Sequence, residues 1–424
     1  MNILHLTNRD KYGAGIAAYR LHLNLLKNKV NSRLLVIEKN HDEKEILEII
    51  PLNFFSKIYR KVVVLGQSFL FSHNNSDENY YFEDQRFSSF RFNTIIKKIP
   101  FIPDVIIVHW ISSFINFRHL YLLQKRTKAL IVFHLLDMGL ITGGCHYAWD
   151  CMNYCKSCGN CPALNSPSVK DLSYKILKYK KKYVNKLNCI VITPTQWLLN
   201  QTVRSSLFTG IEKEKILLGI DEFCFFPQLK YESKKVLKIK YNQKTILIGA
   251  ITFREERKGA RFLIEALEIL INSFLHKPEK ITLIIAGESF PRKIDVLNRF
   301  NILQTGYIKS DHQLSDLYRA ADIFVSASIE DSGPMMINES IISGTPVVSF
   351  EMGAALDLVI NGKTGYIAKN RDSYDLAFGI DKILNLDADQ YNLYSDNCRK
   401  IGLENCSLKK QAHEFEKVFQ RKAT

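Results

Sequence analysis

Two acidic residues, Asp331 and Glu339, are separated by seven residues in a segment that follows an apolar run. Residues 332–334, Ser-Gly-Pro, are typical of the start of a helix, and proline suits its first turn. Free N–H groups at a helix start can bind hydroxyl groups or phosphate oxygens. Two carboxylates placed in this way can accept hydrogen bonds from the vicinal hydroxyls of a sugar or ribose. The alternative is a solvated loop acid beside a glutamate on the helix surface.

A group of cationic side chains follows the apolar run Ile246–Ala250. Arg254, Arg257 and Lys258 precede Gly259 in this loop. Such side chains can stabilise the negative charge that builds up on a diphosphate leaving group, and arginine does so with a bidentate fork. An ordinary charged loop is the alternative interpretation.

The amino-terminal half has weaker signals at the ends of its apolar runs. Gly13 and Gly15 follow the first run and begin a helical pattern, and glycine allows a backbone to approach a phosphate or sugar closely. A plain turn would use the same glycines. His109, His134 and Asp137 lie at or just after two further runs. A histidine at a strand end is either part of a site or structural, and the sequence leaves that choice open.

Five of the nine cysteines lie between positions 145 and 161. In a reducing compartment, such a cluster favours a metal site over disulfides. Cys158 and Cys161 have a spacing that suits tetrahedral zinc, and Cys145 and Cys151 would complete a four-thiolate site. Because four thiolates leave no open position, the zinc would be structural. The alternative is a set of free buried thiols.

Short apolar strands alternate with helical patterns along most of the chain, which predicts α/β domains with parallel sheets. The expected strands are Asn2–Leu6, Ser32–Ile37, Val105–His109, Ala129–His134, Cys189–Thr193, Ile246–Ala250, Ile281–Ala286, Ile323–Ala327 and Pro346–Phe350. Ligands bind such sheets outside the carboxyl ends of the strands. The chemically interesting residues follow strands, as this rule requires.

The length of 424 residues indicates two doubly wound domains. The first covers residues 1–225 and includes the Cys-rich segment 143–162, and the second covers residues 235–395. A Lys-rich stretch at 227–244 is typical of a linker, and a helical segment, 396–424, ends the chain. We expect the two domains to face each other across a cleft.

The composition, 46% hydrophobic and 24% charged, is that of a globular protein rather than a disordered chain. The formal net charge of +15 favours anionic partners such as phosphates, nucleic acid or an acidic membrane, but no nucleic-acid motif supports the second of these. Arg9 and Asp10 interrupt the first apolar run, so it does not have the form of a secretory signal. No apolar stretch approaches the ~18 residues of a spanning helix. These features predict a cytoplasmic protein.

Lysines surround an apolar stripe in the helical pattern at 170–187. Such a helix could rest on an anionic membrane or meet a lipid phosphate of a substrate. A packed stripe with a solvated lysine face is the alternative.

The motifs of the carboxyl-terminal half resemble those of the retaining glycosyltransferase family 4, whose members have the GT-B fold of two facing Rossmann-like domains. The family has an acid-x7-acid motif where this chain has Asp331 and Glu339, although its usual form is Glu-Gly-Phe-Gly followed by a second Glu. Further similar segments are Lys258-Gly259, 284–288 Ile-Ile-Ala-Gly-Glu, 306–308 Gly-Tyr-Ile, 344–348 Gly-Thr-Pro-Val-Val and 361–366 Asn-Gly-Lys-Thr-Gly-Tyr.

This resemblance implies roles for the acidic and basic residues. Asp331 would contact the donor sugar, and Glu339 would bind the ribose of the nucleotide. Lys258 and an arginine would hold the diphosphate in place of a divalent metal, so catalysis would need no cofactor. The arginine is out of the family's usual register, and both Arg254 and Arg257 are near enough to serve.

The resemblance also assigns backbone contacts to several glycines. Gly333 at the helix start would bind the donor, and Gly306 and Ile308 would read the base edge. Gly13 and Gly15 would line the floor of the cleft.

A His-Asp pair lies near the reacting sugar in the family. Asp137 matches the acid of that pair, but Leu136 stands where the family has its histidine. His134 and His109 are therefore the candidates for the histidine role.

The Gly-Gly-Cys-His-Tyr motif at 143–147 and the Cys-Gly-Asn-Cys-Pro motif at 158–162 are similar to an insertion in a family 4 subgroup associated with bacterial exopolysaccharide synthesis. The cysteine spacing of that subgroup selects Cys145, Cys151, Cys158 and Cys161 and leaves Cys155 surplus.

The expected function is that of a retaining glycosyltransferase that uses a UDP- or GDP-sugar. Its acceptor would be a glycan or a lipid-linked molecule in exopolysaccharide or lipopolysaccharide synthesis. The enzyme would be cytoplasmic, with a peripheral contact at the inner face of the plasma membrane as a further option. The rival interpretations are a sugar-nucleotide epimerase of the same fold and a non-catalytic sugar-nucleotide-binding scaffold.

Overall fold

The computed structural model describes residues 1–49, 78–288, 290 and 294–423, together with Ile58, Lys61, Val62 and Leu65. The chain forms two compact units. The first contains Met1–Pro194, Leu198–Ile216 and the chain from Ala412 onward. The second contains Thr195–Trp197 and Leu217–Gln411.

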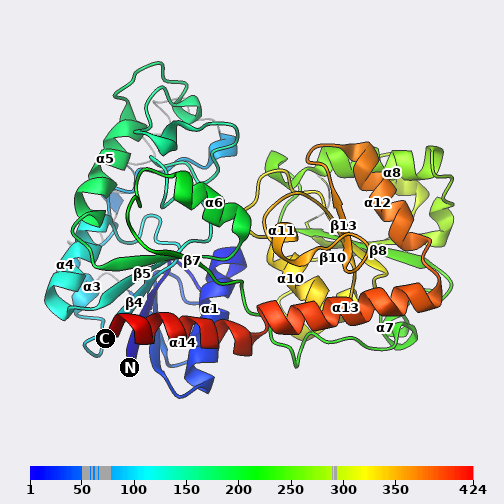
Figure 1. The fold of residues 1–424 in the computed structure, drawn as a ribbon, viewed down its shortest axis with the longest axis horizontal. Coiled ribbons are helices and arrows are strands. Elements are labelled where there is room, and N and C mark those ends of the chain that lie inside the picture. Colours follow the sequence, from blue (N-terminus) through cyan, green and yellow to red (C-terminus); the bar gives the residue numbers. More distant parts are fainter. Residues whose placement is uncertain are drawn as a thin grey trace. The chain divides into compact units, whose positions relative to one another are not determined.

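The first unit has a seven-stranded sheet within the described residues (Figure 1). Its strands are β1 (Asn2–Leu6), β2 (Asn31–Val36), β3 (Ile46–Glu48), β4 (Val105–Val108), β5 (Leu130–His134), β6 (Cys189–Thr193) and β7 (Lys213–Lys215). They lie in the order β3-β2-β1-β4-β5-β6-β7, and all neighbours are parallel. The helices are α1 (Tyr12–Lys27), α3 (Phe92–Ile96), α4 (Phe117–Thr127), α5 (Leu172–Val184) and α6 (Gln196–Arg204).

The second unit repeats this plan with six strands in the described residues. They are β8 (Lys244–Ala250), β9 (Ile281–Gly287), β10 (Asn301–Gly306), β11 (Ile323–Ser326), β12 (Val347–Phe350) and β13 (Gly365–Ala368). Their order is β10-β9-β8-β11-β12-β13, again parallel throughout. The helices are α7 (Lys230–Val236), α8 (Ala260–Asn272), α9 (Asp311–Ala320), α10 (Met335–Ile342), α11 (Ala355–Leu358), α12 (Ser373–Leu384) and α13 (Ala388–Cys406). The last helix, α14 (Leu408–Ala423), begins in the second unit, and most of it belongs to the first.

Both sheets are doubly wound, with the strand order reversing at β1 and β4 in the first unit and at β8 and β11 in the second. Sheets of this type bind ligands outside the carboxyl ends of the strands at the reversal point. The fold class predicted from the sequence, two Rossmann-like α/β domains, is confirmed. A ligand site is therefore expected in the loops that follow β8 and β11.

Each unit has its own hydrophobic core. In the first, Leu21 of α1 and Phe415 of α14 pack with Ile107 of β4 and Val132 of β5. These central strands are buried on both faces, as expected for a parallel sheet covered by helices.

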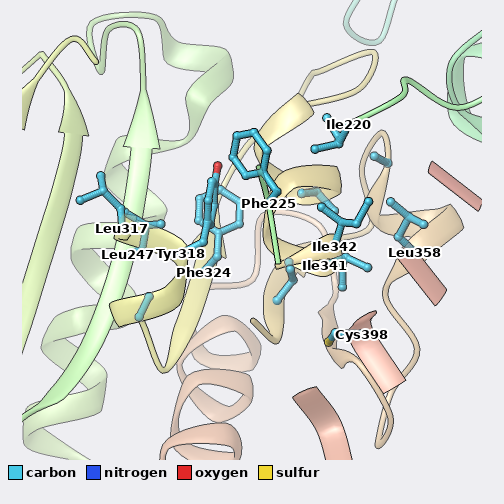
Figure 2. Packing of buried hydrophobic residues seen from close by; sticks show 14 of the residues in the cluster. Ile220, Phe225, Leu247, Leu317, Tyr318, Phe324, Ile341, Ile342, Leu358 and Cys398 are labelled. Atoms are coloured by element: carbon cyan, nitrogen blue, oxygen red, sulfur yellow. The ribbon is translucent and has the colours of Figure 1, made fainter. Parts of the chain in front are cut away.

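Figure 2 shows part of the core of the second unit, where the ring of Tyr318 from α9 lies beside Phe324 of β11. The two ring centroids are 6.0 Å apart in an edge-to-face arrangement, which is a favourable geometry for aromatic pairs. Ile341 and Ile342 extend the same core from α10. This core fixes α9 and α10, and α10 carries one of the candidate acids.

The division of the chain differs from the expected boundaries. Ile220 and Phe225 belong to the core of the second unit, so the division lies at residues 216 and 217 rather than near 225. The expected linker contains α7, and Lys234 of this helix donates a hydrogen bond to Asp322 over 3.2 Å. The last helix, α14, passes from the second unit into the first.

Candidate active site

Lys258 and Arg257 meet Asp331 at the reversal point of the second sheet. Lys258 follows β8, and its Nζ donates to Oδ2 of Asp331 over 2.6 Å. Arg257 Nη1 donates to the same oxygen over 3.1 Å and also pairs with Glu255. The other carboxylate oxygen of Asp331 accepts the N–H of Gly333 over 3.1 Å. The structure therefore brings together two cations, one acid and the glycine at the start of α10, all of which the sequence analysis selected.

Burial and charge have opposite effects on this group. Burial alone would raise the pKa of Asp331, but Lys258 and Arg257 lower it below its ordinary value. Burial and the neighbouring Arg257 lower the pKa of Lys258, and Asp331 partly offsets that change. Asp331 is thus held as a carboxylate, and two positive charges are concentrated where an anionic ligand would bind.

A cavity of about 460 Å³ lies at the carboxyl ends of β8, β9 and β10. Its volume lies in the usual range for small-molecule sites. The lining residues are Arg254, Gly287, Glu288, Phe290, Gln304, Gly306 and Tyr307. Phe290 stacks on Phe253 with ring centroids 4.2 Å apart.

Gly306 and Ile308, which were predicted to contact the base, have different positions relative to this cavity. Gly306 lines it, has a φ of 67° and leaves open space where a side chain would project. Ile308 packs against the core instead. The two arginines that were candidates for the diphosphate also have different positions. Arg254 lines the cavity, whereas Arg257 binds Asp331.

Glu339 lies in α10 and is buried, with 3% of its surface exposed. Its Oε2 accepts a hydrogen bond from the Tyr318 hydroxyl over 2.8 Å. The hydroxyl projects from the aromatic cluster in Figure 2. The core therefore orients the carboxylate through Tyr318, and a ligand would reach a side chain that is already fixed.

The glycines after β1 serve two different purposes. A Cβ on Gly15 would lie 2.6 Å from the carbonyl oxygen of Arg9, so this position needs glycine for packing. A Cβ on Gly13 would meet nothing within 4 Å. Gly13 is therefore the one of the two that leaves room for a ligand.

The two candidate histidines lie inside the first sheet. His134 Nδ1 and His109 Nδ1 are 3.0 Å apart, and His109 Nε2 is 3.0 Å from Nδ1 of His5. His134 also meets the ring of Phe415 edge to face. Burial lowers the pKa of His134 to about 3, and burial together with neighbouring histidines lowers that of His109. Both residues are neutral core histidines in this structure.

His146, which the sequence analysis did not select as a site residue, is the histidine that contacts Asp137. Its Nδ1 lies 2.8 Å from Oδ2 of Asp137, and its Nε2 lies 3.7 Å from Glu83. Burial alone would lower the pKa of His146, but Asp137 and Glu83 raise it to about 10. The Cys-rich segment thus places a histidine with a raised pKa beside Asp137. Leu136, the residue next to Asp137, is where the resemblance led us to expect a histidine. The Gly-Gly-Cys-His-Tyr motif contained His146, but its pairing depends on tertiary contact.

All nine cysteines are described by the structure, and all are free thiols. Cys145, Cys151, Cys158 and Cys161 line one small cavity. Within the described residues, no three His, Cys, Asp or Glu side chains are already arranged as metal ligands.

Helix α5 carries its buried stripe on Ser173, Ile176, Leu177, Lys180 and Val184. Lys175, Lys178, Lys182 and Lys186 are exposed, whereas Lys180 is fully buried. In the part of the chain that the structure describes, no helix is long and apolar enough to cross a membrane.

Residues 242–386, which include Lys258, Asp331 and Glu339, match the family described as Glycosyl transferases group 1. This similarity therefore lies within the second unit. An uncharacterized glycosyltransferase of Methanocaldococcus jannaschii is 28% identical over 57% of this chain and 64% of its own length. The alpha-monoglucosyldiacylglycerol synthase of Streptococcus pneumoniae is 28% identical over 53% of this chain and 51% of its own length. The chain thus spans about half to two thirds of these relatives.

Solved structures extend the likeness of fold to both units. Anabaena HepE in complex with UDP and glucose has a TM-score of 0.65 at 15% identity, with 99% of each chain covered. Sucrose-phosphate synthase from Thermosynechococcus elongatus has a TM-score of 0.66 at 14% identity, also with 99% of each chain covered. The whole chain therefore has the GT-B fold.

Proposed function

We propose that the chain is a retaining glycosyltransferase that transfers a sugar from a UDP- or GDP-sugar to a glycan or lipid-linked acceptor. The observation that carries this proposal is the convergence of Lys258 and Arg257 on Asp331, in the same unit as the cavity lined by Arg254. Fixed cations at the reversal point of a doubly wound sheet suit a diphosphate. The similarity to group 1 glycosyltransferases and the bound UDP and glucose of the HepE structure support a nucleotide-sugar donor.

In the proposed donor complex, the diphosphate lies next to Lys258 with Arg254 or Arg257. Asp331 faces the donor sugar, and Glu339 accepts hydrogen bonds from the ribose hydroxyls. The base occupies the cavity near Gly306. The side-chain cations supply the electrostatic stabilisation that a divalent metal gives in other transferases.

In the proposed reaction, the acceptor hydroxyl attacks the anomeric carbon from the face of the leaving group. The bond from the acceptor oxygen to this carbon forms as the bond to the diphosphate oxygen breaks. The diphosphate leaves with the bonding electrons and takes the hydroxyl proton. No protein nucleophile is needed, and the configuration at the anomeric carbon is retained.

The proposed acceptor side is the first unit, with Gly13 and the Asp137–His146 pair as its polar groups. Relatives named for a glucosyldiacylglycerol synthase and for capsular polysaccharide biosynthesis support a lipid-linked or surface-polysaccharide acceptor. The exposed lysines of α5 would suit a peripheral contact with anionic lipid at the cytoplasmic face of the plasma membrane. Sedimentation with anionic and neutral vesicles tests this contact, because only the anionic vesicles should retain the protein.

The test of the function is a turnover assay with a panel of UDP- and GDP-sugars. A transferase releases nucleotide slowly from one donor even without acceptor, and proton NMR of the released sugar should show the anomer of the donor first. Release of the opposite anomer would contradict retention. A new nucleotide-sugar without net release would indicate an epimerase, and no turnover with any donor or acceptor would indicate a binding scaffold.

A further inference from the structure

The Cys-rich segment brings four sulfur atoms to one place. Cys145, Cys151, Cys158 and Cys161 line a cavity of about 10 Å³, which has room for one particle the size of a water molecule. Cys155, which is also described, does not line this cavity and ends the short helical turn Asn153–Cys155. Four of the five cysteines of this segment therefore lie around one cavity, and Cys155 lies outside it.

The backbone around these cysteines has left-handed residues and packs closely against neighbouring segments. Cys158, Gly159 and Asn160 all have positive φ angles, of 56°, 92° and 45°. A Cβ at Gly143 would lie 2.4 Å from the carbonyl oxygen of Ser173 and 3.0 Å from the Cys158 sulfur. A Cβ at Gly159 would lie 2.1 Å from the carbonyl oxygen of Val169. Such a strained loop persists only where the surroundings fix it.

A buried cation lies beside the same group. Lys180 is fully buried, and its ammonium donates to the carbonyl oxygens of Gly139 over 2.6 Å and Thr142 over 2.9 Å. The Cys158 and Cys145 thiols and the Glu83 and Asp137 carboxyls are the groups whose negative charge would favour this ammonium. A buried charge is costly unless it is paired. Zn²⁺ with four thiolates has a net charge of −2 and would add to the negative charge of the two carboxylates.

We propose that Cys145, Cys151, Cys158 and Cys161 bind one zinc ion as four thiolates. The sulfurs must move inward from their present positions to reach Zn–S distances of roughly 2.3 Å. With four protein ligands the ion is structural, and the site is separate from the transfer chemistry. Since Cys145 directly precedes His146, the ion also holds the loop that delivers His146 to Asp137.

The experiment measures metal in the full chain, purified under reducing conditions without chelator or metal-affinity resin. Elemental analysis should give about one zinc per chain. Replacement with cobalt should give the visible bands of tetrahedral Co²⁺ and the near-ultraviolet band of thiolate ligands. Cys158→Ser should lose most of the metal and become susceptible to protease between residues 145 and 161, because the local fold depends on the ion.

Cys155→Ser is the matched control, since it removes a thiol from the same segment and should retain metal, cobalt spectrum and protease resistance. Equal metal loss in both variants would overturn the assignment of ligands. Wild-type protein that contains no zinc and shows no thiolate–cobalt band would overturn the proposal, even if Cys158→Ser failed to fold. A disulfide between Cys158 and Cys161, found by mass spectrometry after alkylation of protein kept anaerobic, would also overturn it. None of these outcomes depends on glycosyltransferase activity.

Discussion

Lys258 and Arg257 both donate to the same oxygen of Asp331. The effect of replacing one cation on folding therefore depends on the cation that remains. If Lys258 is replaced by alanine, Arg257 still neutralises the buried carboxylate, so the fold should survive. The positive charge available to the diphosphate falls, however. We expect Lys258→Ala to lower kcat/KM for the nucleotide-sugar roughly 10²-fold or more, the usual effect of removing one donor to a developing anion.

The measurement is a steady-state assay on the donor that the panel identifies, with thermal melting as the check on folding. Lys235→Ala is a suitable control because Lys235 is an exposed lysine of α7 in the same unit. Unchanged kinetics in Lys258→Ala would remove Lys258 from the site.

Glu339 is held by Tyr318 before any ligand binds. Replacement by glutamine keeps the shape of the side chain and an oxygen that can accept from Tyr318, but it removes the charge. A hydrogen bond to a charged group contributes about 1.5–3 kcal/mol. Glu339→Gln should therefore raise the Kd for the donor nucleotide roughly ten- to a hundredfold, as measured by isothermal titration calorimetry. An unaltered Kd would refute the ribose assignment.

The sequence selected those members of this candidate site that lie within a local pattern. Asp331, Gly333, Lys258 and the arginines occupy loops that directly follow strands, and a topological rule then brings these loops together. His146 could not be found in the same way. It reaches Asp137 from the Cys-rich segment, whereas the strand-end histidines His109 and His134 are buried in the core of the first unit.

At the scale of elements, the strands that the sequence missed are all at the edges of the sheets. They are β3, β7, β10 and β13. Central strands of a parallel sheet are buried on both faces and are therefore continuous apolar runs. An edge strand needs no such run, and β7 has the sequence Lys-Glu-Lys. Helix α7 was predicted to be a linker because its sequence is rich in lysine. Lys234 of this helix is buried and forms an ion pair with Asp322, a partner that is distant in sequence and cannot be found from the local pattern.

The buried histidines of β1, α1, β4 and β5 give the first unit a defined response to acid. Burial lowers the pKa of His134 to about 3, and burial with a smaller effect of Arg33 lowers that of His22 to about 4, from 6.5. As the pH falls through 6.5, the unfolded chain takes up protons that the folded chain does not. The stabilisation is thus complete above pH 6.5 and is lost toward pH 4, by about 1.4 kcal/mol for each pKa unit of separation.

Chemical denaturation at several pH values measures this effect as the slope of the unfolding free energy between pH 6.5 and 4. His134→Gln should reduce the slope because it removes one of the responsible groups. His413→Gln, the same change at an exposed histidine of α14, should leave the slope unaltered. An equal slope in wild type and His134→Gln would show that other groups control the acid response.

At the scale of the whole molecule, the two units have separate cores and separate sensitivities. The buried histidines lie in the first unit, whereas Lys258, Asp331, Glu339 and the cavity lined by Arg254 lie in the second. Multidomain chains commonly unfold in more than one step. A ligand stabilises only the state and the part of the chain that bind it.

We therefore expect two unfolding transitions in scanning calorimetry, each of which responds to a different condition. UDP or GDP at one hundred times its Kd should stabilise the second unit by about 2.7 kcal/mol and raise the temperature of its transition, with little change in the other. Lowering the pH from 7 to 5 should lower the transition temperature of the first unit more strongly than that of the second, because His22 and His134 become charged only when the first unit unfolds. Lys258→Ala should weaken the nucleotide effect and leave the acid effect unaltered. A single transition whose temperature changes with both nucleotide and acid would mean that the two units unfold together. A nucleotide that stabilised only the acid-sensitive transition would place the donor site in the first unit.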